Sequence, residues 1–222
     1  MKNNSTRDIR GPKMAHLVVH NHFDLAWKKT YEENIEVWED ILKKVLDLCE
    51  INSRFRYFQS QVLVLKPFLR RNPGARIRII RAIRRGVLEI NGGDLSEGDV
   101  GFIGGESIIR NRLLGLEWME KTLGIRVRTA DLHCNGLSPQ VPQILAKLGF
   151  EFLLPGKGVG ENVAPPYVWR SPDGTGILTD RRIETTFGYY EMLSRHKVAQ
   201  NIRAAAETVA ATRRDAGLIV NI

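Results

Sequence analysis

The fold of this chain is indicated most directly by residues 17–27, which read LVVHNHFDLAW. The first three residues are apolar, as in a buried strand, and the polar residues that follow begin a loop. Alternate side chains of an extended chain share a face, so His20, His22 and Asp24 are expected to point the same way. Two imidazoles and a carboxylate at this spacing can hold a divalent ion. Zinc is the first candidate, because it accepts nitrogen and oxygen ligands together. The alternative is an ordinary loop in which one histidine is hydrogen-bonded and Asp24 caps the next helix.

Strand-like and helix-like segments alternate along the rest of the chain. Thr30 and Glu33 are spaced as a capping box ahead of an apolar stripe at helical spacing. Further strands are expected at 56–61, 87–90, 127–133, 152–154 and 218–222, with a hairpin over 167–179. Helices are expected between them, including one that ends at Gly124, one capped by Ser138 and one over about 194–214.

This order of segments predicts a parallel α/β fold, open or barrel-shaped. In such folds the chemistry gathers at the carboxyl ends of the strands. His22 and Asp24 follow the first strand, and Asp131 and His133 lie at the end of a later one. We therefore expect two separate strand ends to bring metal-compatible side chains to the same rim.

Composition narrows the class of protein. The chain has 222 residues, 43% of them hydrophobic and 26% charged, which suits one globular domain. It has no run of about 18 apolar residues, so no membrane span or membrane partner is expected. Residues 1–13 lack the apolar stretch of a secretion signal, and a cytoplasmic location is expected. The two cysteines, Cys49 and Cys134, are expected to be reduced.

The net charge of +8 raises the question of nucleic-acid binding. The basic residues are densest over 70–85, where isoleucines recur every third residue. This pattern predicts an amphipathic helix with its arginines in solvent. No aromatic residues interleave with them as a stacking platform requires, so nucleic acid is not expected as a partner.

Taken together, the segments resemble the N-terminal catalytic domain of glycoside hydrolase family 38, the α-mannosidases. The resemblance covers about residues 15–222, after a polar extension of residues 1–14. It is carried by HNHFDLAW (20–27), FQSQ (58–61), EINGGDLSEGD (89–99), GGESIIRNRLLGLEWMEKTLGI (104–125), SPQVPQILAKLGF (138–150) and WRSPDGTGIL (169–178).

The resemblance implies a seven-stranded, parallel, barrel-like domain of a zinc-dependent retaining enzyme that removes α-linked mannose. His22 and Asp24 match zinc ligands of the family, whereas His20 matches a motif position that is not a ligand. Trp27 matches an aromatic position near the sugar. A zinc ion, or another divalent metal, would bind sugar hydroxyls while a carboxylate attacks the anomeric carbon.

One position departs from the family pattern. The family's third zinc ligand is an aspartate that doubles as the nucleophile, and here the matching residue is His133. Histidine can bind zinc but cannot form a glycosyl ester. Asp131 would share the face of His133 and could serve as a shifted nucleophile; alternatively, it pairs with an arginine such as Arg126 or Arg128. Cys134 is a soft donor that should face the other way, as a buried structural cysteine.

Two further features limit the match. Glu97 and Asp99 occupy polar positions of the family loop, where they either contact the sugar or hold the loop by hydrogen bonds. The family's remaining zinc ligand and its acid/base carboxylate match positions beyond Ile222, so a downstream polypeptide that completes the enzyme is an expected partner. His196 does not match the remaining ligand and is expected on a solvated surface.

Three functions remain open from the sequence. The first is an α-mannosidase-type glycosidase domain. The second is a non-catalytic relic that binds metal or carbohydrate. The third is a metal-dependent carbohydrate deacetylase, with His22, Asp24 and His133 as ligands and Asp131 as the base for a metal-bound water.

Overall fold

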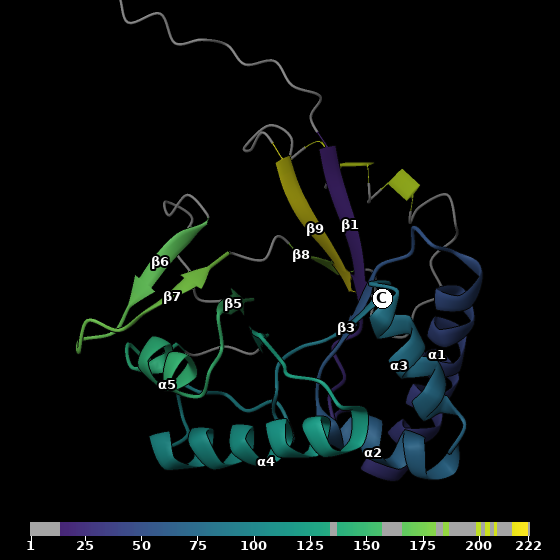
Figure 1. Cartoon of the computed structure of the whole chain (residues 1–222), viewed down its shortest axis with the longest axis horizontal. Coiled ribbons are helices and arrows are strands. Elements are labelled where there is room, and N and C mark those ends of the chain that lie inside the picture. The colour runs from purple at the N-terminus through teal and green to yellow at the C-terminus, as the bar shows by residue number, and fades with distance from the viewer. Residues whose placement is uncertain are drawn as a thin grey trace, which may run out of the picture.

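The computed structural model describes residues 14–133, 137–156, 166–180, 184–186, 199–200, 203–204, 207 and 215–221. Its strands form two sheets (Figure 1). The first comprises β1 (Met14–His20), β2 (Tyr57–Gln59), β3 (Leu88–Ile90), β8 (Glu184–Thr186) and β9 (Asp215–Asn221), in the order β3-β2-β1-β9-β8. The second comprises β4 (Thr129–Leu132), β5 (Phe152–Pro155), β6 (Tyr167–Arg170) and β7 (Gly176–Thr179), in the order β4-β5-β7-β6.

The predicted parallel α/β fold is confirmed, because β6 and β7 form the one antiparallel pair among the described strands. The seven-stranded barrel is not confirmed, since the described strands form two sheets that are not joined into one closed ladder. β3 and β4 nevertheless lie side by side. Gly92 N–H donates to the Thr129 carbonyl at 2.9 Å, and the Thr129 hydroxyl donates to Glu89 at 3.0 Å.

The helices are α1 (Tyr31–Ile51), α2 (Val62–Arg71), α3 (Ala75–Arg84), α4 (Gly105–Leu123) and α5 (Val141–Lys147). Figure 1 shows α1, α2 and α3 grouped beside the first sheet, α5 beside the β6–β7 hairpin, and α4 running from one group toward the other. One apolar core joins these layers, with Tyr57, Phe68, Met119 and Leu153 among its fully buried side chains. None of the described helices has the length and apolar character needed to cross a membrane.

Local signals in the sequence explain several element ends. The Thr30 hydroxyl accepts from Glu33 N–H at 3.2 Å and Glu33 accepts from Thr30 N–H at 2.8 Å, so the predicted capping box begins α1. Gly124 ends α4 at a φ of 68°. Asp173 accepts from Thr175 N–H at 3.0 Å in the turn of the predicted hairpin.

Other expectations about the elements needed correction. Ser138 does not cap α5, which begins at Val141 after a turn that Ser138 stabilises by accepting from Gln140 N–H. The strand β1 begins at Met14, the last residue of the predicted extension. Most of the helix expected over 194–214 lies outside the described residues.

Most of the arginine-rich segment forms an amphipathic helix, α3, as predicted, but its buried face is not the predicted isoleucine stripe, since Ile77 is 62% exposed. Ala75, Ile79 and Ala82 are buried on one side of the helix. Arg78 points away from the core, where its guanidinium bonds Asp47 and Glu50, at 2.6 Å in both cases. Part of the basic charge is therefore used in surface ion pairs.

Candidate functional site

The carboxyl ends of β1 and β4 bring three predicted metal ligands together. The rings of His22 and His133 stack with 3.8 Å between their centroids and 16° between their planes. The His22 Nε2 atom is 3.4 Å from Asp24 Oδ1. Two strand ends therefore bring His22, Asp24 and His133 to one rim, as expected, and their role as metal ligands stays a prediction.

His22 has a carboxylate beside each of its ring nitrogens. Glu97, from the loop after β3, places its Oε2 atom 3.1 Å from His22 Nδ1, while Asp24 faces Nε2. The side chains of His22 and Glu97 are only 7% and 8% exposed, so little water competes with their contact. The two carboxylates therefore lie on opposite sides of one imidazole ring.

The pair of His22 and Asp24 has the spacing that a zinc ion requires. Two ligand atoms at about 2.1 Å from a tetrahedral zinc lie about 3.4 Å apart, which matches the separation of Nε2 and Oδ1. His133 fits less directly, because the lone pairs of two stacked rings run nearly parallel. Within the described residues no three His, Cys, Asp or Glu side chains surround a common point. The donor types suit zinc, and zinc binding by these residues stays a prediction. Cys134 lies outside the described residues.

His20 lies behind this cluster and is fully buried. Its ring stacks on Phe58 at 4.2 Å and tilts against His133 at 5.7 Å. A continuous row of ring contacts thus runs from Phe58 through His20 and His133 to His22.

Asp131 is 3% exposed and is held by an arginine that the sequence did not single out. Arg112 of α4 donates from Nη2 to the Asp131 carbonyl at 3.1 Å, and the same guanidinium lies 3.7 Å from Asp94 Oδ2. Burial raises the pKa of Asp94 above its ordinary value, and the cation of Arg112 opposes that rise. Of the arginines considered as partners of Asp131, Arg128 instead donates to Glu151 at 2.8 Å.

The predicted sugar-binding residues differ in their surroundings. Trp27 is 40% exposed, and the Lys28 ammonium lies 4.5 Å from its ring centroid. Asp99 accepts from Gly101 N–H at 3.2 Å and so shapes its own loop. Glu97 faces His22 as described above. Sugar contact by these three residues remains a prediction.

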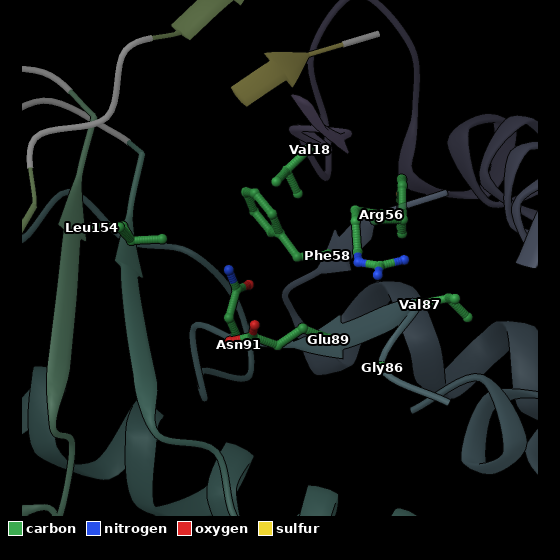
Figure 2. A pocket seen from close by; sticks show the side chains of 9 residues that line it. Val18, Arg56, Phe58, Gly86, Val87, Glu89, Asn91 and Leu154 are labelled. Atoms are coloured by element: carbon green, nitrogen blue, oxygen red, sulfur yellow. The ribbon is translucent and has the colours of Figure 1, made fainter. Parts of the chain in front are cut away.

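A cavity of about 200 Å³ lies beside β2 and β3 and reaches Leu154 of the second sheet. Figure 2 shows Val18 and Phe58 of the first sheet facing Leu154 of the second, with Glu89 and Asn91 along one side.

Comparison with known proteins identifies the family. The sequence pattern of the glycosyl hydrolases family 38 N-terminal domain matches residues 13–217. This chain belongs to that family. The resemblance carried by its sequence segments is thus confirmed over nearly the whole chain.

Relatives of this family 38 domain are much longer than the chain. It is 25% identical over 183 residues to a putative mannosylglycerate hydrolase of Halalkalibacterium halodurans, covering 75% of this chain and 20% of that protein. It is 27% identical over 167 residues to α-mannosidase G of Dictyostelium discoideum, covering 73% of this chain and 15% of that protein. The chain therefore spans a fifth or less of the length of either relative.

Solved structures support the fold of the domain. An α-mannosidase from Enterococcus faecalis V583 superposes with a TM-score of 0.74 at 21% identity, over 94% of this chain and 25% of that one. A putative polysaccharide deacetylase from Mycobacterium smegmatis superposes with a TM-score of 0.61 at 15% identity, over 96% of this chain and 78% of that one. At these identities the likeness concerns the fold alone.

Proposed function

We propose that this family 38 domain provides the metal- and sugar-binding part of an α-mannosidase-type glycoside hydrolase that acts on α-linked mannose. One observation carries the proposal: His22, Asp24, Glu97 and His133 form one cluster at the carboxyl ends of parallel strands. The membership of the family and the name of the Dictyostelium relative support mannose as the sugar.

In this proposal each residue has a defined task. His22 and Asp24 would hold a zinc ion with His133 as a further donor, and Glu97, whose Oε2 lies 3.1 Å from His22 Nδ1, would orient the His22 ring. The ion, when bound, supplies a Lewis acid for sugar hydroxyls. Trp27 offers an exposed aromatic face to the apolar side of the sugar ring.

The retaining step needs a carboxylate that attacks the anomeric carbon. His133 cannot supply it, and Asp131 precedes His133 by two residues at the end of β4. We therefore assign the attack to Asp131: its ester with the anomeric carbon forms as the glycosidic bond breaks, and the leaving alcohol takes its proton from the acid/base carboxylate expected on the downstream polypeptide. Its backbone is fixed by Arg112, so the carboxylate belongs to a rigid part of the site.

Metal content tests the ligand assignment. We expect purified chain equilibrated with zinc to hold about one ion per chain, and His22→Ala or Asp24→Ala to hold less than about a tenth of that. His133→Ala is expected to weaken zinc binding as well. Elemental analysis after dialysis measures these values.

The matched control is His16→Ala, because His16 is exposed on the same strand β1 and lies away from the cluster. It is expected to keep the zinc content of the parent chain. Unchanged zinc in His133→Ala would remove that residue from the ligand set.

Hydrolysis of an aryl α-mannoside in the presence of zinc tests the activity. The chain is assayed alone and together with any polypeptide encoded downstream of it. We expect the mannoside to be hydrolysed. Asp131→Asn is expected to lower the turnover by at least about a thousandfold, because the amide cannot form the glycosyl ester. His133→Asp restores a carboxylate at the family's position and is expected to raise turnover.

Absence of turnover in both the parent chain and His133→Asp, with zinc bound, would reject the catalytic proposal. The domain would then be a non-catalytic protein that binds metal or carbohydrate.

A second candidate, a metal-dependent carbohydrate deacetylase, is favoured by one feature. His133 beside His22 and Asp24 makes a ligand set of two histidines and one aspartate, with Asp131 available as a base. This chemistry needs no glycosyl ester. Release of acetate from an acetylated amino-sugar oligomer, without turnover of the mannoside, would establish the deacetylase function in place of the mannosidase function.

A further inference from the structure

Gln61 has a backbone conformation that is unusual for its residue type. It lies between β2 and α2 with φ 66° and ψ 114°, and its side chain is 2% exposed. Among the described non-glycine residues only Lys28 shares a positive φ. Such a conformation costs conformational energy and persists where the surrounding structure requires it.

The amide of Gln61 joins two loops that are far apart in sequence. Its Nε2 donates to the carbonyl of Phe23 at 3.0 Å, and its Oε1 accepts from Glu97 N–H at 3.3 Å. Phe23 separates His22 from Asp24 in the chain, so one buried side chain touches both loops of the cluster. Glutamine suits this position because its amide offers a donor and an acceptor at once.

The residues after Gln61 attach the Glu97 loop in a different way. Val62 N–H donates to the Asp94 carbonyl at 3.0 Å, and Leu63 N–H donates to the Leu95 carbonyl at 2.9 Å. These backbone bonds keep the first part of the loop against α2 whatever side chain occupies position 61. The amide of Gln61 adds the contact at Glu97 itself, whose carboxylate lies 3.1 Å from His22 Nδ1.

We propose that Gln61 is a positioning residue for the metal-binding pair, an inference that rests on the proposed function of that pair. The left-handed backbone aims the amide between Phe23 and Glu97. Glu97 is then held on His22 Nδ1, and His22 Nε2 is held toward Asp24. The conformational cost at Gln61 is retained because it orders the two loops.

Two substitutions separate positioning from simple stability. Gln61→Gly relieves the backbone strain, because glycine accepts a positive φ, but it removes the side-chain amide. Gln61→Met keeps the backbone strain and the length of the side chain, but it cannot form either hydrogen bond. We expect Gln61→Gly to melt at a higher temperature than Gln61→Met. We expect both to bind zinc about tenfold or more weakly than the parent chain, as for other lost contacts to ligating histidines. Calorimetric melting and zinc titration against a chelator measure the two properties.

Gln59→Met is the matched control, because Gln59 is a buried glutamine on β2 whose Nε2 donates to the Ser60 carbonyl and whose Oε1 accepts from Tyr57. It is expected to lower the melting temperature and to leave zinc affinity unchanged. The proposal would be overturned if zinc affinity followed the melting temperature across the three variants. It would also be overturned if Gln61→Gly bound zinc as tightly as the parent chain.

A metal-free measurement keeps this inference separate from the proposed function. The ring ¹⁵N signals of His22 at a fixed pH are expected to move in both Gln61 variants and to stay in place in Gln59→Met. If the parent chain binds no zinc, the metal site is rejected, and these signals alone decide the role of Gln61. Unmoved signals in Gln61→Gly would reject it.

Discussion

Arg112→Met is expected to lower the free energy of unfolding by about 3–5 kcal/mol at neutral pH. Arg112 is 2% exposed and its guanidinium lies 3.7 Å from the equally buried Asp94. Removing the cation leaves a buried carboxylate without its counter-charge and the Asp131 carbonyl without the 3.1 Å bond. Urea unfolding at pH 7, followed by circular dichroism, measures the loss.

The deficit of Arg112→Met is expected to depend on pH in a defined direction. Burial raises the pKa of Asp94, and Arg112 lowers it. Without Arg112 the folded-state pKa of Asp94 rises further above its unfolded value. A raised carboxyl pKa favours the folded state below the unfolded pKa, and that advantage is lost as the pH rises through the folded pKa. The deficit should therefore be smallest in acid and grow toward neutral pH.

Two variants test the cause of this loss. Asp94→Asn in the Arg112→Met background removes the unpaired charge and is expected to recover part of the stability. Arg110→Met on the same helix breaks only an exposed pair with Glu106 and should change stability by less than about 1 kcal/mol. An equal loss in both arginine variants would show that the buried ion pair is not the cause.

Gly115→Ala is expected to destabilise the domain by about 3 kcal/mol, although alanine is the better helix former. A Cβ atom at Gly115 would lie 2.4 Å from the Gly93 carbonyl oxygen and 2.6 Å from the Asp94 carbonyl carbon. Both atoms belong to the backbone, so the clash can be relieved only if the loop after β3 moves away from α4. Because that loop also carries Glu97, zinc binding is expected to weaken together with stability.

Gly105→Ala is the control for this helix. The nearest atom to its added Cβ is Ile144 Cδ1 at 3.9 Å, an ordinary contact. It is expected to be neutral or to stabilise the domain by up to about 1 kcal/mol. The same denaturant measurement serves both variants, and a neutral Gly115→Ala would contradict the close packing of α4 on the loop.

Several features of the site could be predicted without coordinates. The alternation of His20, His22 and Asp24 after an apolar run placed the latter two at a strand end, and Asp131 and His133 were placed at another. Both placements follow from the two-residue period of a strand and from the shared edge of parallel strands. The family segments, which the comparison confirms, supported the same arrangement.

Other features could not be predicted, because they depend on side chains far apart in sequence. An arginine on a helix is expected in solvent, and Arg112 gave no signal that it lies buried against Asp94 and Asp131. Gln61 belongs to a quoted segment, but its positive φ and its contacts with Phe23 and Glu97 exist only in the folded chain. Likewise, no spacing rule indicates that Glu97 reaches His22 Nδ1.

The alternating elements and the family could be predicted from the sequence alone, and so could the meeting of His22, Asp24 and His133 at strand ends. These follow from local periodicity and from short motifs, which are readable along the chain. Three features became visible only in the folded chain: two sheets rather than one closed barrel, a histidine between two carboxylates, and a strained glutamine that joins their loops. The reason is physical, since packing and hydrogen bonding between distant segments set those distances.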